Sequence, residues 1–197
     1  MTSEQVHWLY GALLAAFSVP MLLHARGIVT SRWPEFTIGA ALLLFGLGLI
    51  FDPFLHGAAG PGDYAAETAQ HLTLGIVLLL GSGFELFRVA TRRQTFLWRA
   101  PLVLALLAAS LTFLVHAQHE ASVSMLLLVT QHRFIAATLL VLAAAVLLEP
   151  VGDARTRGIA LPLLTLLLGL ELLVYTEGNS LFGVPAGTHQ SAGAGGH

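Results

Sequence analysis

The chain between residues 100 and 148 contains two apolar runs, 100–115 (APLVLALLAASLTFLV) and 134–148 (FIAATLLVLAAAVLL), on either side of a polar centre. That centre begins with His116-Ala117-Gln118-His119-Glu120 and ends with Gln131-His132-Arg133. An ionisable side chain in hydrocarbon costs several kcal/mol unless it is paired or coordinates an ion. The stretch therefore predicts a helical hairpin in a membrane, with a metal or haem site close to its turn.

Composition places the whole chain among membrane proteins. Of its 197 residues 56% are hydrophobic and 10% are charged, with a mean hydropathy of +0.79, whereas soluble domains carry about 25% charged residues. The net charge of -2 gives no basic excess of the kind that binds nucleic acid. The sequence has neither cysteine nor lysine, which excludes disulfides, thiolate metal sites, Schiff-base chemistry and P-loops.

Six segments are apolar enough to cross a bilayer, which takes about 20 residues. They cover approximately 5–24, 35–56, 69–89, 100–119, 124–148 and 158–176. The fourth and fifth are separated by very few residues, so we expect them to form a tight antiparallel hairpin. The sequence thus predicts an all-α, six-helix transmembrane domain over residues 1–178. A flexible Gly/Ala/Ser-rich tail is expected over 179–197, and the first apolar run is expected to be a retained span.

The arginines predict the orientation of the bundle. Eight of the nine fall in or beside the connections that follow the first, third and fifth spans, and only Arg133 belongs to the other side. Because basic residues concentrate on the cytoplasmic side, both termini are predicted to lie outside the cytoplasm. We expect a multi-pass protein of the inner (plasma) membrane.

Each predicted span carries one ionisable side chain at a similar height above its inner end. The separation is 17 residues in five spans, as between His116 and Arg99, and 14 in the sixth, between Glu171 and Arg157. With about 1.5 Å of rise per residue, these groups form one layer roughly 20–25 Å above the inner ends. The layer contains His7, Asp52, His71, His116, His132 and Glu171.

This layer and its neighbours offer the ligands of a transition-metal site. Asp52 and His56 are four residues apart, as are His116 and Glu120, so each pair shares a helix face. Imidazole and carboxylate suit zinc, iron or copper, and neighbouring glutamines would orient the imidazoles. The candidate metal ligands are His7, Asp52, His56, His71, His116, His119, Glu120, His132 and Glu171. The alternative cofactor is a b-type haem held by His71 with His116 or His132.

Structural explanations compete with ligation for these residues. The hairpin histidines would otherwise form a polar network, and His7 would otherwise be an interfacial residue. Asp52 and His56 would otherwise cap a helix end. Glu120 and Glu171 would otherwise carry protons or act as counter-ions of Arg133.

The hairpin resembles the transmembrane protein forty-five family, a eukaryotic multi-spanning family whose domain has no settled function. The resemblance consists of an apolar helix that ends in His116 and His119, then an apolar stretch followed by Gln131 and His132. His71, early in the third span, fits the same outline. The resemblance implies a shared histidine-rich membrane architecture and no particular reaction.

The sequence predicts a protein that binds a transition metal near the outer, periplasmic face, with a redox or metal-handling role. The alternatives are a b-type haem subunit and a metal-dependent membrane enzyme, either a lipid hydrolase or an oxygenase. No catalytic residue is assigned.

The inner halves of the spans are almost purely apolar, which favours a closed site over a channel. The expected partners are the lipid bilayer, a metal ion and other membrane subunits.

Overall fold

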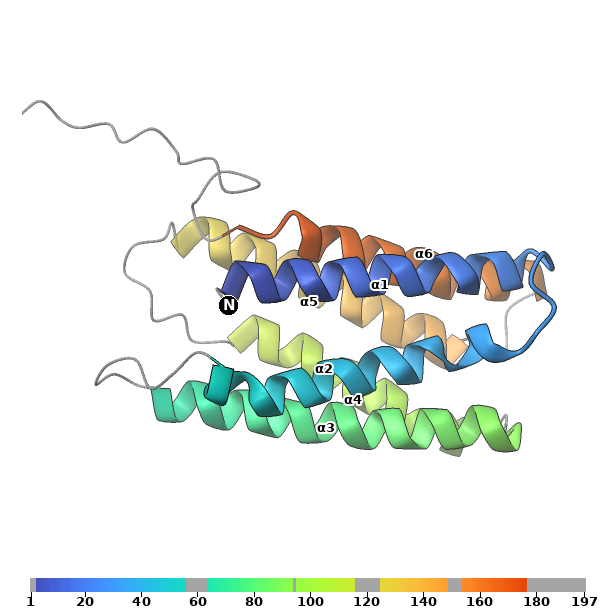
Figure 1. The fold of residues 1–197 in the computed structure, drawn as a ribbon, viewed down its shortest axis with the longest axis horizontal. Helices are drawn as coiled ribbons and strands as arrows, with labels where there is room; N and C mark the ends of the chain where they lie inside the picture. Colours follow the sequence, from blue (N-terminus) through green and yellow to red (C-terminus); the bar gives the residue numbers. More distant parts are fainter. Residues whose placement is uncertain (1–2, 56–63, 94, 116–124, 149–153, 177–197) are drawn as a thin grey trace, which may run out of the picture.

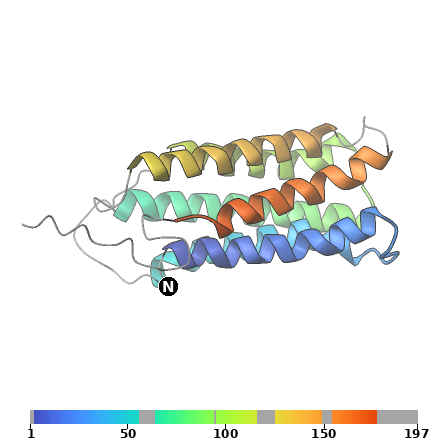
Figure 2. The same cartoon turned by 90° about the horizontal axis from the view of Figure 1, so that it is seen from above.

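The structure is a computed structural model, and it describes residues 3–55, 64–93, 95–115, 125–148 and 154–176. In these residues all regular structure is helical, which confirms the predicted all-α class. The elements are α1 (Ser3–Ala25), the 3₁₀ helix η1 (Trp33–Phe36), α2 (Thr37–Leu55), α3 (Tyr64–Thr91), α4 (Phe96–Val115), α5 (Met125–Leu148) and α6 (Ala154–Leu173). The six α-helices lie side by side and alternate in direction (Figures 1 and 2).

Among the residues that the structure describes, five helices are long and apolar enough to cross a membrane. Their candidate spans are Glu4–Ala25, Trp33–Phe51, Thr68–Thr91, Phe96–Val115 and Leu127–Leu148. The apolar part of α6 is shorter and runs from Gly158 to Leu173. At about 1.5 Å per residue it covers less than the roughly 30 Å of a bilayer core. A multi-pass helical membrane protein is therefore the architecture that the structure supports, and the sixth span stays a prediction.

Neighbours in sequence are neighbours in space, and α1 also packs along α6, so the first and last helices lie side by side (Figure 2). Small residues allow this contact: a Cβ built on Gly11 would lie 2.7 Å from the backbone oxygen of Gly169. Close approach through glycine is typical of helix pairs in membranes, where packing and not water exclusion drives association. Gly46 and Gly75 play the same part between α2 and α3.

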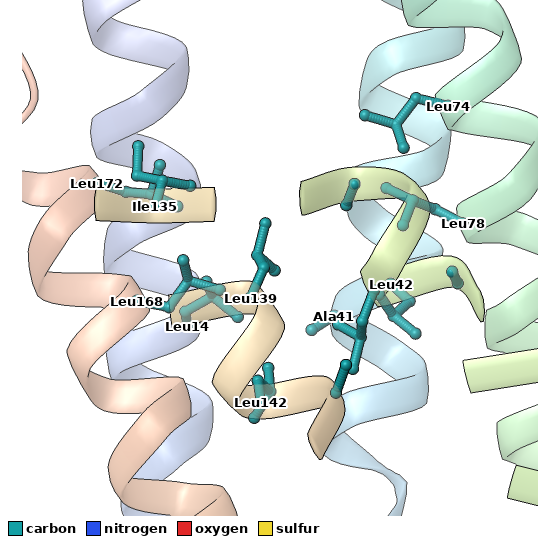
Figure 3. Packing of buried hydrophobic residues seen from close by; sticks show 14 of the residues in the cluster. Leu14, Ala41, Leu42, Leu74, Leu78, Ile135, Leu139, Leu142, Leu168 and Leu172 are labelled. Atoms are coloured by element: carbon teal, nitrogen blue, oxygen red, sulfur yellow. The ribbon is translucent and has the colours of Figure 1, made fainter. Parts of the chain in front are cut away.

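The core is aliphatic, with a few hydroxyl groups bonded between helices. Figure 3 shows Leu14, Leu139 and Leu168 meeting between α1, α5 and α6. The buried Ser110 hydroxyl donates to the carbonyl of Ala136 across α4 and α5 at 2.9 Å. Because a bilayer core contains no water to bond a hydroxyl group, this bond satisfies the hydroxyl within the protein.

The two ends of the bundle differ in chemistry. Helices α1, α3 and α5 begin at one end, which carries His7, His71, His132 and Arg133; we call it the histidine end. The opposite end, which we call the arginine end, carries Arg26, Arg32, Arg88, Arg92, Arg93 and Arg99. Arg99 differs from its expected place in a connection, because α4 begins at Phe96 and buries this arginine to 5% exposure.

Candidate functional site

At the histidine end, helices α1 and α5 each place a histidine ring against Tyr175, which follows α6 and is 1% exposed. The His7 ring from α1 stacks on it at 3.8 Å between centroids with 16° between planes. The His132 ring from α5 stacks on it at 5.7 Å and 14°. Phe113 of α4 meets His132 edge-on at 5.4 Å. Two predicted layer residues, His7 and His132, are thus brought to the same aromatic ring.

Hydrogen bonds fasten the end of α6 to α1 and α5. The Trp8 indole donates to the carbonyl of Tyr175 at 2.9 Å. The Gln131 amide donates to the Thr176 carbonyl at 2.8 Å and accepts from the Thr176 backbone N–H at 2.9 Å. Tyr175 and Thr176 follow α6, which ends at Leu173, so these side chains hold the segment after the helix against α1 and α5. Gln131 therefore holds the chain of α6, a different role from the predicted orientation of an imidazole.

Glu4 completes this fastening and was not among the predicted site residues. Its carboxylate accepts a hydrogen bond from the Thr176 hydroxyl at 3.0 Å, and it is only 8% exposed. Tyr175 and Thr176 were missed as well, because a tyrosine and a threonine beside an apolar helix are not titratable ligands of the kind that the sequence search relied on. The only sequence clue was an acid in the first turn of the first span.

Glu171 lies inside the bundle, where it was predicted, but not beside Arg133. Its Oε1 accepts a hydrogen bond from the Thr138 hydroxyl on α5 at 2.7 Å. Its Oε2 is buried and accepts no hydrogen bond from the part of the chain that the structure describes. Arg133 is exposed, and no ion pair joins it to Glu171. The predicted role of Glu171 as counter-ion of this arginine is therefore absent from the described contacts.

A lateral groove of about 270 Å³ opens between α3 and α4 at the histidine end. Gln70, the residue before His71, and Val115, the residue before His116, both line it. The groove is mainly apolar, with the hydroxyls of Thr73 and Thr112 as further polar groups. Its full lining is Ala69, Gln70, Thr73, Leu74, Val77, Ala108, Thr112 and Val115.

The structure describes only some of the predicted metal ligands. His56, His116, His119 and Glu120 lie outside the described residues, and of Asp52 only the backbone is described, near the end of α2. His71 is half-buried on α3. Across residues 3–55, 64–93, 95–115, 125–148 and 154–176, no three histidine or acid side chains are grouped closely enough to hold a metal ion. The described half of the site therefore needs further ligands before it can be a metal centre.

The arginine end holds ion pairs. Glu85 is paired with Arg88 through two bonds of 2.7 Å, a contact that their spacing of three residues on one helix allows. Arg32 forms a second two-bond pair with Glu35, at 3.1 and 3.0 Å. This hydrogen bonding to Glu35 raises the pKa of the Arg32 guanidinium above its usual value. The His24 ring lies 3.7 Å from the same carboxylate.

Comparison of the chain with protein families, with curated proteins and with solved structures found no match in any of the three.

Proposed function

We propose that this protein is an integral membrane protein that binds a transition metal at its histidine end. His71, His116, His119 and His132 would be the principal ligands, with Asp52, His56, Glu120 or Glu171 completing the site. Copper, zinc or iron suits this donor set. Following the arginine distribution, we place the site near the outer, periplasmic face of the inner membrane, with both termini on that side.

The contact between Phe113 and His132 carries this proposal. It places the last turn of α4 directly against the buried imidazole of α5, which is 4% exposed. His116 follows Phe113 by three residues, a spacing that puts two side chains on one face of a helix. A continuation of α4 would therefore bring the imidazole of His116 towards that of His132.

Two contacts bear on the roles of His7 and Glu171 among the candidate metal ligands. The stacking of His7 on Tyr175 gives this imidazole a structural role, and the bond from Thr138 occupies one oxygen of Glu171. The other oxygen, Oε2, accepts no hydrogen bond from the described residues and could take a metal ion or a proton. We therefore assign Glu171 a secondary place in the site and His7 a supporting one.

The test is the metal and haem content of the purified protein, measured without chelators. Stoichiometric metal in the wild type, lost from the double variant His116→Ala with His132→Ala, is expected. His24→Gln, at the arginine end, is the matched control and should keep its metal. A wild type free of metal and haem would refute the proposal, whereas a Soret band lost in the double variant would select the haem alternative.

The groove beside His71 favours a second candidate, a metal-dependent membrane enzyme acting on a lipid-derived substrate. It is apolar, opens laterally and is flanked by Gln70 and Val115, the neighbours of two proposed ligands. A substrate arriving from the bilayer would reach the metal along it. Thr112→Trp should fill the groove, abolish turnover of such a substrate and leave the metal content unchanged. Loss of metal in that variant would argue against a separate substrate groove.

A further inference from the structure

We propose that the arginine end carries a binding site for the head group of an anionic phospholipid, formed by Arg92 and Arg93 beside Trp98. This site lies at the opposite end of the bundle from the proposed metal centre and does not depend on it.

Charge balance is the first reason. Six arginine side chains and two glutamates, Glu35 and Glu85, are described at this end, which leaves four arginines in excess. Both acids are already engaged, each by two hydrogen bonds from its own arginine. The charged side chains that are exposed in the described part of this end are Arg26, Arg92 and Arg93, and all three are cationic.

The surroundings of Arg93 point to a lipid and not to a soluble anion. Its guanidinium lies 5.3 Å from the centroid of the Trp98 ring, within cation–π range. Trp98 in turn contacts Phe87, with 5.2 Å between centroids. Next to them Phe96 is 55% and Leu97 is 79% exposed. Tryptophan and basic side chains above an apolar surface are typical of the head-group level of a bilayer.

The backbone of Arg92 is the third reason. Helix α3 ends in a Schellman motif: the N–H of Arg93 bonds to the carbonyl of Arg88, and the N–H of Arg92 to that of Val89. Arg92 occupies the left-handed position of the motif, with φ of +57°. Glycine is favoured there, and α1 has Gly27 at the equivalent position, with φ of +72°. An arginine at this position is less favourable for the helix end than glycine, and the position places its exposed side chain beside Arg93.

The experiment compares binding of phosphatidylglycerol and phosphatidylcholine to the intact protein in mixed micelles, by native mass spectrometry. The wild type should prefer the anionic lipid, and added salt should weaken that preference. Removing each arginine should reduce the preference about fivefold, so Arg92→Gln with Arg93→Gln should lose roughly 25-fold. Arg133→Gln, which removes an exposed arginine from the histidine end, is the matched control and should change it less than about twofold.

Arg92→Gly separates binding from folding. It should reduce the preference for the anionic lipid while the melting temperature in detergent stays equal or rises, because glycine relieves the strained position. Equal lipid preference in the wild type and the double variant would overturn the proposal. So would an equal loss in Arg133→Gln, which would mean that only net charge matters.

Discussion

The contact between α1 and α6 gives a sharp prediction about stability, because it depends on a glycine with no room for a side chain. A Cβ on Gly11 would lie 2.7 Å from the oxygen of Gly169 and 2.8 Å from the backbone nitrogen of Leu173. Ordinary contact with a Cβ begins near 3.4 Å. Both obstacles are backbone atoms, so no side-chain rotation can relieve the clash, and Gly11→Ala must move one helix away from the other.

The size of the effect follows from two opposing terms. Overpacking of this kind lowers the free energy of unfolding by about 1–3 kcal/mol. Replacing glycine by alanine within a helix raises it by up to about 1 kcal/mol. We expect a net destabilisation of about 1–2 kcal/mol. His7 lies one turn before Gly11 on the same face, so its stacking on Tyr175 should loosen as well.

Gly83→Ala provides the matched control, because nothing lies within 4 Å of a Cβ built there. This variant should be as stable as the wild type or more so. Reversible unfolding in detergent, followed by circular dichroism, measures both variants under the same conditions. The packing argument is wrong if Gly11→Ala unfolds like the wild type, or if Gly83→Ala is destabilised to the same extent.

Two further substitutions test the polar contacts at the two ends. Gln131→Leu removes both hydrogen bonds to the backbone of Thr176 and should cost about 2 kcal/mol in the same unfolding assay; an unchanged midpoint would mean that the end of α6 is held by packing alone. Glu85→Gln leaves the partly buried Arg88 without its carboxylate and should cost about 3 kcal/mol. Arg32→Gln, which breaks a much more exposed pair, should change the midpoint far less, and equal losses would contradict this ranking.

Much of the fold follows from composition and apolar length. Within the described residues a helix occupies each predicted span, because apolar runs of this length leave the backbone no other way to satisfy its polar groups in a bilayer. The predicted adjacency of α4 and α5 is confirmed, whereas the tight turn predicted between them lies outside the described residues. Helix boundaries were less predictable: α4 begins at Phe96 and includes Arg99, since a buried arginine cannot be told from a loop arginine by residue type.

The sequence could predict the site only at positions that carry titratable residues. His7 and His132 were found by counting residues from the arginine end, and both lie against one ring. Tyr175, which joins them, carries no such mark, and its position depends on how α6 ends and crosses α1. That crossing is set by Gly11 and Gly169, and pairing between helices far apart in sequence is not encoded in any local pattern.

X-ray absorption at the edge of the bound metal tests the proposed metal centre most directly. For a site built from His71, His116, His119 and His132, we predict a first shell dominated by nitrogen at about 2.0–2.1 Å for zinc. Multiple scattering from the imidazole rings should accompany it and should weaken in His132→Ala. A first shell of oxygen without imidazole scattering, or a spectrum unchanged in His132→Ala, would contradict the proposed metal site.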